Sequence, residues 1–96
     1  MTTPLNTPQV TEALQELPGW SFVDDKLVKT FSFSSFKEAV SFIVRVAFEA
    51  EQLNHHPEIR NVYSRVEIGL TTHDAGDRVT GKDVELATSI DGFSWV

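Results

Sequence analysis

Apolar residues recur with two different periods along this 96-residue chain, and that alternation restricts its fold more than any other feature. Segments 7–17, 35–55 and 80–92 carry apolar residues three and four positions apart, as helices do. Segments 20–33 and 62–72 carry them at every second position, as strands with one buried face do. The predicted order is helix, hairpin, helix, one long strand or two strands, helix. Because no parallel crossover rhythm appears, we predict a single α+β domain over residues 1–96, with an antiparallel sheet and helices on one face.

Two turn signals set the first half of this order. Thr7 followed by Pro8 predicts the start of the first helix, because threonine caps helices and proline is tolerated in their first turn. The pair Pro18-Gly19 predicts its end. Asp24-Asp25 predicts a tight hairpin turn. Alternate positions of the strand that follows are occupied by Leu27, Lys29, Phe31 and Phe33.

The long middle helix is apolar over more than half of its circumference. We expect Ser34 or Ser35 to cap it, and Pro57 to end it near His55, because a residue before proline is pushed out of helical geometry. Its predicted core stripe consists of Phe36, Val40, Ile43, Ala47 and Ala50. Four more apolar residues lie outside that stripe: Phe42, Val44, Val46 and Phe48. A surface helix of a monomer needs one apolar stripe, so we expect a second face to be buried, for example by another subunit.

The last part of the chain combines a strand pattern with a helix start. In segment 62–72, the residues that point to one side are Val66, Ile68 and Leu70. Residues 74–77 form a predicted loop. Thr80 and Asp83 have the spacing of a capping box, which predicts the start of the last helix, and Gly92 is placed at its end. The apolar residues of this helix are Val84, Ala87 and Ile90.

Composition and charge exclude several classes of function. The chain has no cysteine, which excludes disulfides, thiol catalysis and cysteine-bound zinc. Its formal net charge is −6 without a lysine and arginine cluster, so we expect no direct binding of nucleic acid. No signal peptide is predicted, and the longest apolar-rich stretch, 42–50, is interrupted by Arg45 and Glu49 and too short to span a bilayer. We therefore expect a cytoplasmic protein that binds no membrane.

His55 is the first candidate for chemistry. Glu51 lies four positions before it, so in a helix that reaches His55 the two side chains share one face. A histidine in the last helical turn also lies near the negative end of the helix dipole. Both effects favour the protonated imidazole, which suits general acid catalysis near neutral pH. The alternative is a solvated surface pair worth about 0.3 kcal/mol.

Two further histidines could join the same cleft. His56 precedes Pro57 and is rotated off the helix face, and His73 ends a strand at the start of an acidic loop. If the strand end lies beside the helix end, the three imidazoles converge. Three histidines could also bind zinc, but adjacent ligands before a proline are not a typical zinc pattern, and no cysteine or acidic cluster completes a ligand set. Asp83 has a purely structural alternative, because it can close the capping box with Thr80.

The spacing of these residues resembles the signature of a known family. The pterin-4a-carbinolamine dehydratases, also known as dimerisation cofactors of homeodomain transcription factors, have a motif similar to Glu51-x3-His55-His56-Pro57-x5-Tyr63-x9-His73 followed by Asp83. Other segments in family-like order are Gly19-Trp20, Phe31-Ser32-Phe33, Asn61-Val62-Tyr63, Thr72 to Gly76 and Lys82-Asp83. The resemblance covers nearly the whole chain, and so many fixed intervals make it specific.

This resemblance implies a fold, an assembly and an activity. The implied fold is a four-stranded antiparallel sheet covered on one face by three helices. The implied assembly is a homodimer or homotetramer that uses sheet edges and the long helix. The implied reaction removes water from 4a-hydroxytetrahydropterin, a small-molecule substrate, and gives quinonoid dihydropterin in the recycling of the tetrahydropterin that aromatic amino acid hydroxylases use. No metal or organic cofactor is implied.

The resemblance also implies roles for individual residues. His55 and His73 are the acid and base candidates, His56 contributes to catalysis or substrate binding, and Glu51 orients the site. The helix-end argument favours His55 as the acid. The residues implied to contact the pterin are His55, His56, Pro57, Thr72, His73, Asp74, Ala75 and Asp83.

Three departures from the family pattern bear on the substrate. Asn54 and Lys82 stand where many relatives carry aspartate and arginine, and the loop at 76–80 lacks a second glycine and a leucine. These changes affect substrate affinity and preference more than the reaction. The alternative function is a non-catalytic dehydratase-like binding or assembly module that contacts a protein partner through its oligomer surface. The complete set of three histidines favours the enzyme.

Overall fold

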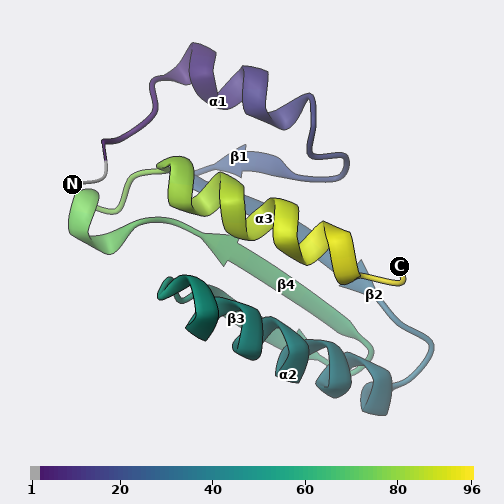
Figure 1. Cartoon of the computed structure of the whole chain (residues 1–96). Coiled ribbons are helices and arrows are strands. Elements are labelled where there is room, and N and C mark those ends of the chain that lie inside the picture. The colour runs from purple at the N-terminus through teal and green to yellow at the C-terminus, as the bar shows by residue number, and fades with distance from the viewer. Residues whose placement is uncertain (1–2) are drawn as a thin grey trace.

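The computed structural model describes residues 3–96, which form three helices on one face of a four-stranded antiparallel sheet (Figure 1). The helices are α1 (Thr7–Leu14), α2 (Phe36–Leu53) and α3 (Gly81–Phe93). The strands are β1 (Ser21–Val23), β2 (Lys26–Ser32), β3 (Glu58–Val62) and β4 (Arg65–Leu70). A short 3-10 turn, η1, spans His73–Ala75. The predicted α+β class is confirmed.

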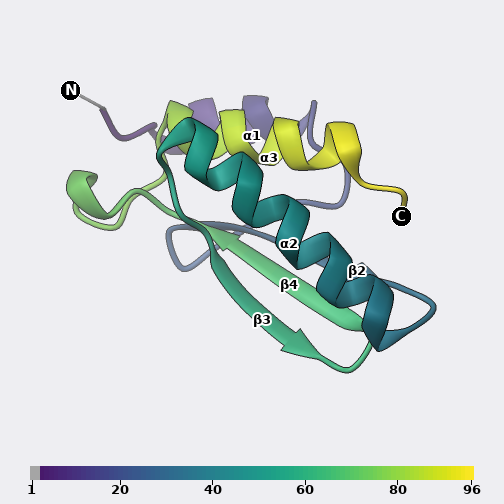
Figure 2. The ribbon, with the colours of Figure 1, turned by 60° about the horizontal axis from the view of Figure 1, so that its bottom comes forward.

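The molecule has two layers, and the strand order in the sheet is β1-β2-β4-β3. Figure 2 shows all three helices on one side of the sheet, while its other face carries no helix of the described residues. Helix α2 packs against both β4 and α3. Strands β1 and β3 are the two edges. None of the helices in residues 3–96 is long and apolar enough to cross a membrane.

Two hairpins build the sheet. Asp24 and Asp25 have φ values of 50° and 60°, the geometry of a two-residue turn whose twist matches that of the flanking strands, so the predicted first hairpin is confirmed. The second hairpin resolves the alternative left open for segment 62–72. It turns at Tyr63, where φ is 53°, and pairs β4 with β3. Sequence periodicity missed most of β3, because this edge strand has exposed or half-buried residues throughout and shows no alternation.

The core lies between the sheet and the helices. Alternate residues of β2 and β4 point into it, as the strand patterns predict, and the fully buried ones are Leu27, Val66, Ile68 and Leu70. Phe42 of α2 is 0 % exposed, and its ring centroid lies 4.7 Å from that of Phe31 and 5.0 Å from that of Phe33. Burial of one such ring contributes about 1.5–3 kcal/mol, so this aromatic contact is a main support of α2 on the sheet.

The predicted core stripe of α2 is largely wrong. The buried residues of this helix are Ala39, Phe42, Val46 and Ala50. Of the predicted stripe, Ala50 is buried and Ile43 half-buried, whereas Phe36, Val40 and Ala47 are exposed. Both faces of the helix are apolar, so periodicity could not decide which one meets the sheet. The expected second apolar face exists, but it is the one that carries Phe36 and Val40.

Several predicted helix ends shift by one or a few residues. Asn6, and not Thr7, caps α1, because its side chain accepts a hydrogen bond from the Gln9 N–H while the Gln9 side chain accepts one from the Asn6 N–H. Ser35 caps α2, one of the two predicted choices. The Thr80 capping box at the start of α3 is confirmed, but this helix continues through Gly92 to Phe93.

Candidate active site

The end of α2 places two histidines outside the helix. Asn54 adopts left-handed geometry, with φ 51° and ψ 46°, and ends the helix after Leu53. The His55 N–H then donates to the Ala50 carbonyl at 2.9 Å, the bond that closes a Schellman-type helix end. The expectation that His55 lies in the last turn, on one face with Glu51, is therefore wrong. Asparagine tolerates left-handed geometry, so the helix ends at Asn54, before Pro57 is reached, and Pro57 is not the cause of the helix end.

His55 is buried and bonded to a carboxylate. Its Nε2 lies 2.5 Å from Asp83 Oδ1, and the residues are 8 % and 0 % exposed. The other oxygen, Asp83 Oδ2, accepts hydrogen bonds from the Thr72 hydroxyl and the Thr80 N–H, each at 2.8 Å. Asp83 thus closes the capping box of α3, as its structural alternative predicted, and also holds His55. A charged group this deeply buried is stable only with such partners.

Backbone bridges hold the two threonines beside Asp83. The Thr72 N–H donates to the Arg78 carbonyl at 2.9 Å, which closes the loop after β4. An isolated β-bridge joins Pro4 to Thr80, next to a hydrogen bond of 2.8 Å from the Leu5 N–H to the Val79 carbonyl. The start of the described chain therefore anchors the N-terminus of α3, from which Asp83 reaches His55.

His56 pairs with the glutamate that was predicted for His55. Its Nε2 lies 2.5 Å from Glu51 Oε2, and the two side chains are 66 % and 74 % exposed. Because α2 ends at Leu53, the chain turns His56 back toward the helix surface while His55 points into the protein. An ion pair this exposed contributes about 0–1 kcal/mol to stability, so its main effect is to orient the His56 ring.

His73 lies in η1 and is 91 % exposed. Its Nδ1 is 3.0 Å from Asp77 Oδ1. The hydrogen bond to Asp77, with the negative charges of Asp77 and Asp74, raises the pKa of His73 above its ordinary value. The protonated imidazole of His73 is therefore favoured. Asp77 was not predicted as a partner, although its place four residues after His73 in a tight loop was a usable signal.

One hollow of about 190 Å³ joins the three histidines. It is lined by Asn54, His55, His56, Thr71, Thr72, His73, Asp74 and Lys82. The predicted convergence of helix end and strand end is therefore present in the structure. Of the other predicted residues, Glu51 reaches the hollow through His56 and Asp83 lies behind His55, whereas Pro57 and Ala75 do not line it. Asn54 and Lys82, two of the three departures from the family pattern, both line it.

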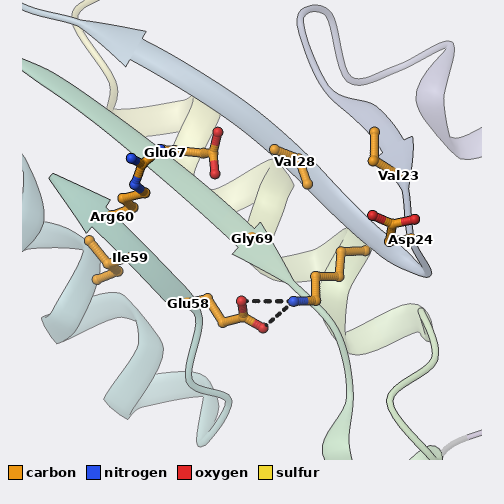
Figure 3. Close-up of a pocket in the computed structure, with 9 residues that line it drawn as sticks. Val23, Asp24, Val28, Glu58, Ile59, Arg60, Glu67 and Gly69 are labelled. Carbon is orange, nitrogen blue, oxygen red and sulfur yellow. Dashed lines mark hydrogen bonds and ion pairs between the residues drawn. The ribbon is translucent and has the colours of Figure 1, made fainter. Parts of the chain in front are cut away.

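A larger hollow of about 490 Å³ lies on the uncovered face of the sheet and contains no histidine (Figure 3). Figure 3 shows Glu58, Arg60, Glu67 and Gly69 on this face, with the ion pair of Glu58 that joins Lys26 at 2.7 Å. Because the three histidines gather at the smaller hollow, we take that hollow as the candidate site. Within residues 3–96, no group of three or more histidine, cysteine, aspartate or glutamate side chains is arranged to hold a metal ion.

Comparison with known sequences agrees on one family. The family model described as "Pterin 4 alpha carbinolamine dehydratase" matches residues 3–93. A relative from Opitutus terrae is 56 % identical over 96 residues, which cover 100 % of this chain and 99 % of the relative. A relative from Solibacter usitatus is 44 % identical over 94 residues, which cover 98 % of this chain and 98 % of the relative. Both relatives are named "Putative pterin-4-alpha-carbinolamine dehydratase".

Two solved structures share the fold. A transcriptional coactivator/pterin dehydratase from Brucella melitensis superposes with a TM-score of 0.87 and 36 % identity, covering 93 % of this chain and 96 % of that one. A pterin dehydratase-like protein described as a RuBisCO assembly factor of the alpha-carboxysome has a TM-score of 0.61 at 23 % identity, with coverage of 76 % and 83 %. The second likeness shows the fold alone.

Proposed function

Because the chain belongs to the pterin 4 alpha carbinolamine dehydratase family, we propose that it removes water from 4a-hydroxytetrahydropterin. The product is quinonoid dihydropterin, and the reaction serves the recycling of a tetrahydropterin cofactor. The observation that supports this proposal most is the gathering of three imidazoles around one hollow, with His55 anchored from behind by a buried carboxylate. The reaction needs proton transfer at two sites, which such a set can supply.

The residues of the hollow divide the proton transfers between them. An acid gives a proton to the C4a hydroxyl, the C4a–O bond breaks and water leaves. A base takes the proton from N5, and the electron pair of that N–H bond forms the C4a–N5 double bond. We assign these steps to His55 and His73, with His56 as a further donor or substrate ligand oriented by Glu51.

His55 is our choice for the acid, for a reason that differs from the helix dipole. Its Nε2 is held by the Asp83 carboxylate at 2.5 Å, which leaves Nδ1 as the ring nitrogen available for proton transfer. Once protonated there, the ring can donate that proton to the leaving hydroxyl and regain one from solvent. Thr72, Asp74 and Lys82 line the hollow as candidate ligands for the pterin ring. At about 190 Å³ the hollow is below the usual range of roughly 300–1,000 Å³ for drug-sized ligands, which suits a small ring system.

The assay follows quinonoid dihydropterin by absorbance, using 4a-hydroxytetrahydropterin generated by a hydroxylase in the same cuvette. We expect the wild-type protein to speed the appearance of product. His55→Ala and His73→Ala should each lower the catalysed rate by roughly 10²–10⁴-fold, the usual value of a positioned acid or base. Glu67→Gln, in the hollow on the uncovered sheet face, is the matched control and should leave the rate unchanged.

A second candidate function is a protein-binding or assembly module. The observation that favours it is a stripe of exposed apolar side chains along α2, formed by Phe36, Val40, Val44 and Phe48. The related structure from Brucella melitensis is described as a coactivator as well as a dehydratase. The same assay separates the two candidates, because no acceleration over buffer at micromolar wild-type protein would rule out the enzyme and leave the binding module.

We also propose that the protein is a homodimer or homotetramer and that this exposed stripe belongs to its subunit interface. A shallow apolar hollow, lined by Ile43, Val44, Ala47, Phe48 and Glu51, continues the stripe toward the end of α2. Exposed apolar patches of this kind on a soluble protein usually mark interaction sites. An isologous interface uses the same patch on both subunits, which a self-complementary helix face provides.

A further inference from the structure

Four buried residues form a continuous hydrogen-bond chain behind the hollow. His55, Thr72, Thr80 and Asp83 are 8 %, 4 %, 0 % and 0 % exposed. Asp83 accepts from His55, from the Thr72 hydroxyl and from the Thr80 N–H, and the hydroxyl oxygens of Thr72 and Thr80 are 2.7 Å apart. Thr72 and Asp83 belong to the predicted site, but Thr80 was assigned only the cap of α3.

Each threonine hydroxyl has one hydrogen to donate, and this fixes the direction of the hydrogen-bond chain. The Thr72 hydroxyl and the Thr80 N–H donate to Asp83 Oδ2, and an ionised Asp83 carboxylate offers only an acceptor to His55 Nε2. Thr72 has one hydroxyl hydrogen and gives it to Asp83 Oδ2 at 2.8 Å, so it can only accept from Thr80. The hydroxyl of Thr80 therefore donates to Thr72, while its oxygen accepts from the Lys82 N–H at 3.2 Å. Each hydroxyl in the chain has one possible orientation.

The same count defines the state of the His55 ring. Because Asp83 can only accept, Nε2 of His55 carries a hydrogen, and the neutral ring is the Nε2–H tautomer. Nδ1 has no hydrogen-bond partner in the described residues. In residues 3–96 the only buried side-chain polar atom that lacks a partner is Asp91 Oδ2, so Nδ1 of His55 is open to solvent. His55 lines the hollow, and Nδ1 is its one ring nitrogen that is not bonded to Asp83.

We propose that Thr80 is a positioning residue for His55, acting through Thr72 and Asp83. This inference rests on the proposed function for its kinetic consequence, but its structural content stands on the hydrogen-bond chain alone. Removing the Thr80 hydroxyl leaves the buried Thr72 oxygen without its donor. The Thr72 hydroxyl then donates to Asp83 without itself accepting a hydrogen bond, and its bond to Asp83 weakens because hydrogen bonds in such chains strengthen one another. The Asp83 carboxylate and the His55 ring lose part of what holds them.

Four variants separate positioning from helix capping. Thr80→Val removes the hydroxyl but keeps the shape, and it also removes the cap of α3. Thr72→Val breaks the hydrogen-bond chain at its next member after Thr80 and leaves the cap of α3 intact. Thr80→Ser keeps both functions and serves as the rescue variant. Ser35→Ala removes the cap of α2, which accepts from the Glu38 N–H, far from the site, and is the control for cap loss.

The decisive measurement is a ¹H–¹⁵N spectrum of the protein labelled at histidine nitrogens. We expect wild-type His55 to show a single Nε2–H tautomer with a strongly downfield ring proton, as its 2.5 Å hydrogen bond requires. Thr80→Val and Thr72→Val should both shift or broaden this resonance. Thr80→Ser and Ser35→Ala should leave it in place. In the dehydratase assay, Thr80→Val should lower kcat by roughly ten- to a hundredfold with little change in KM, the loss expected for a misplaced catalytic group.

Two outcomes would overturn the proposal and are distinct from a failure of the proposed function. An unchanged His55 resonance in folded Thr80→Val and Thr72→Val would show that Thr80 does not position the ring. An equal shift in Ser35→Ala would show that loss of any cap has the same effect. If the resonance moves as expected but wild-type protein shows no activity, the positioning role stands and the dehydratase assignment fails. If Thr80→Val does not fold, an unchanged His55 resonance in Thr72→Val would still overturn the proposal, because the Thr80 hydroxyl reaches Asp83 only through Thr72 in this chain.

Discussion

At the scale of residues, each histidine of the hollow has its own carboxylate. His55 is bonded to buried Asp83, His56 to exposed Glu51 and His73 to exposed Asp77. At His73, the hydrogen bond and the negative charge of Asp77 favour the protonated ring. The three histidines differ in burial, so only His55 is held against the protein interior, whereas His56 and His73 lie on the surface.

The His73–Asp77 pair makes a prediction about pKa. Asp77→Asn removes the charge and weakens the hydrogen bond that raise the pKa of His73, so this pKa should fall toward its ordinary value near 6.5. Asn suits the left-handed geometry of position 77, where φ is 59°, so the loop should keep its shape. The measurement is an NMR titration of the histidine ring protons. Asp74→Asn is the matched control and should lower the pKa less, because Asp74 acts only through its charge.

The sign of the accompanying pH effect follows from linkage. A histidine whose pKa is higher in the folded state adds stability that is fully present below its unfolded pKa, about 6.5, and is lost as pH rises through the folded value. For an exposed side chain the effect on unfolding is small. Its effect on the reaction is direct, because only the neutral ring of His73 can act as the base, and Asp77 moves its deprotonation to a higher pH. A His73 pKa that stays constant or rises in Asp77→Asn would contradict this account.

The candidate site could be predicted at this scale only in part. The identity of the histidines followed from their spacing and from the family resemblance. Their partners did not, because a carboxylate four positions away pairs with a histidine only if the helix continues between them. Glu51 was therefore paired with His55 when the structure pairs it with His56. Thr71 and Thr80 were missed as site residues because nothing in their sequence context distinguishes them from ordinary strand-end and cap threonines.

At the scale of elements, the end of α2 is the feature that builds the site. A left-handed residue at position 54 turns the chain so that successive histidines point to opposite sides, into the core and onto the surface. An aspartate or asparagine can adopt this geometry with less strain than other residues that carry a side chain. The helix end therefore depends on the residue type at this position.

Substitutions of Asn54 test this dependence through stability. Asn54→Ala should lower the free energy of unfolding by about 1 kcal/mol, because a Cβ-bearing residue without a local polar group is strained in left-handed geometry. Asn54→Gly should cost less or be neutral. Gln52→Ala, an exposed position with ordinary helical geometry, is the control and should stay within about 0.5 kcal/mol. Chemical denaturation gives all three values, and an equal loss in Asn54→Gly and Asn54→Ala would show that backbone geometry is not the cause.

At the scale of the whole molecule, the apolar stripe on α2 is the main feature that the described chain leaves uncovered. Phe48 is 71 % exposed, Phe36 59 % and Val44 50 %. Together with Val40 they recur every fourth residue, so they form a ridge inclined to the axis along the outer side of the helix. Glu51, which is paired with His56, also lines the shallow apolar hollow that continues this stripe. A second subunit on the stripe would therefore lie next to the site.

The oligomer proposal predicts that a charge on this ridge dissociates the protein. Phe48→Glu should lower the mass measured by light scattering or sedimentation at micromolar protein, because an unpaired charge is costly in a buried interface. Thr88→Glu places the same charge on an exposed position of α3 and should not change the mass. A wild-type protein that is monomeric at this concentration would contradict the proposal directly. So would a Phe48→Glu protein that keeps the wild-type mass.

The sequence by itself determined what depends on neighbours along the chain. The hairpin turn at Asp24, the capping box of Thr80 and Asp83, and the alternation of helix and strand periods are local, and the structure confirms each of them. Only the tertiary structure decided which apolar face of α2 meets the sheet and what Asp83 does beyond capping. His55 and Asp83 are 28 positions apart, and no local pattern encodes a contact that exists only after the helix end and the loop after β4 have packed together.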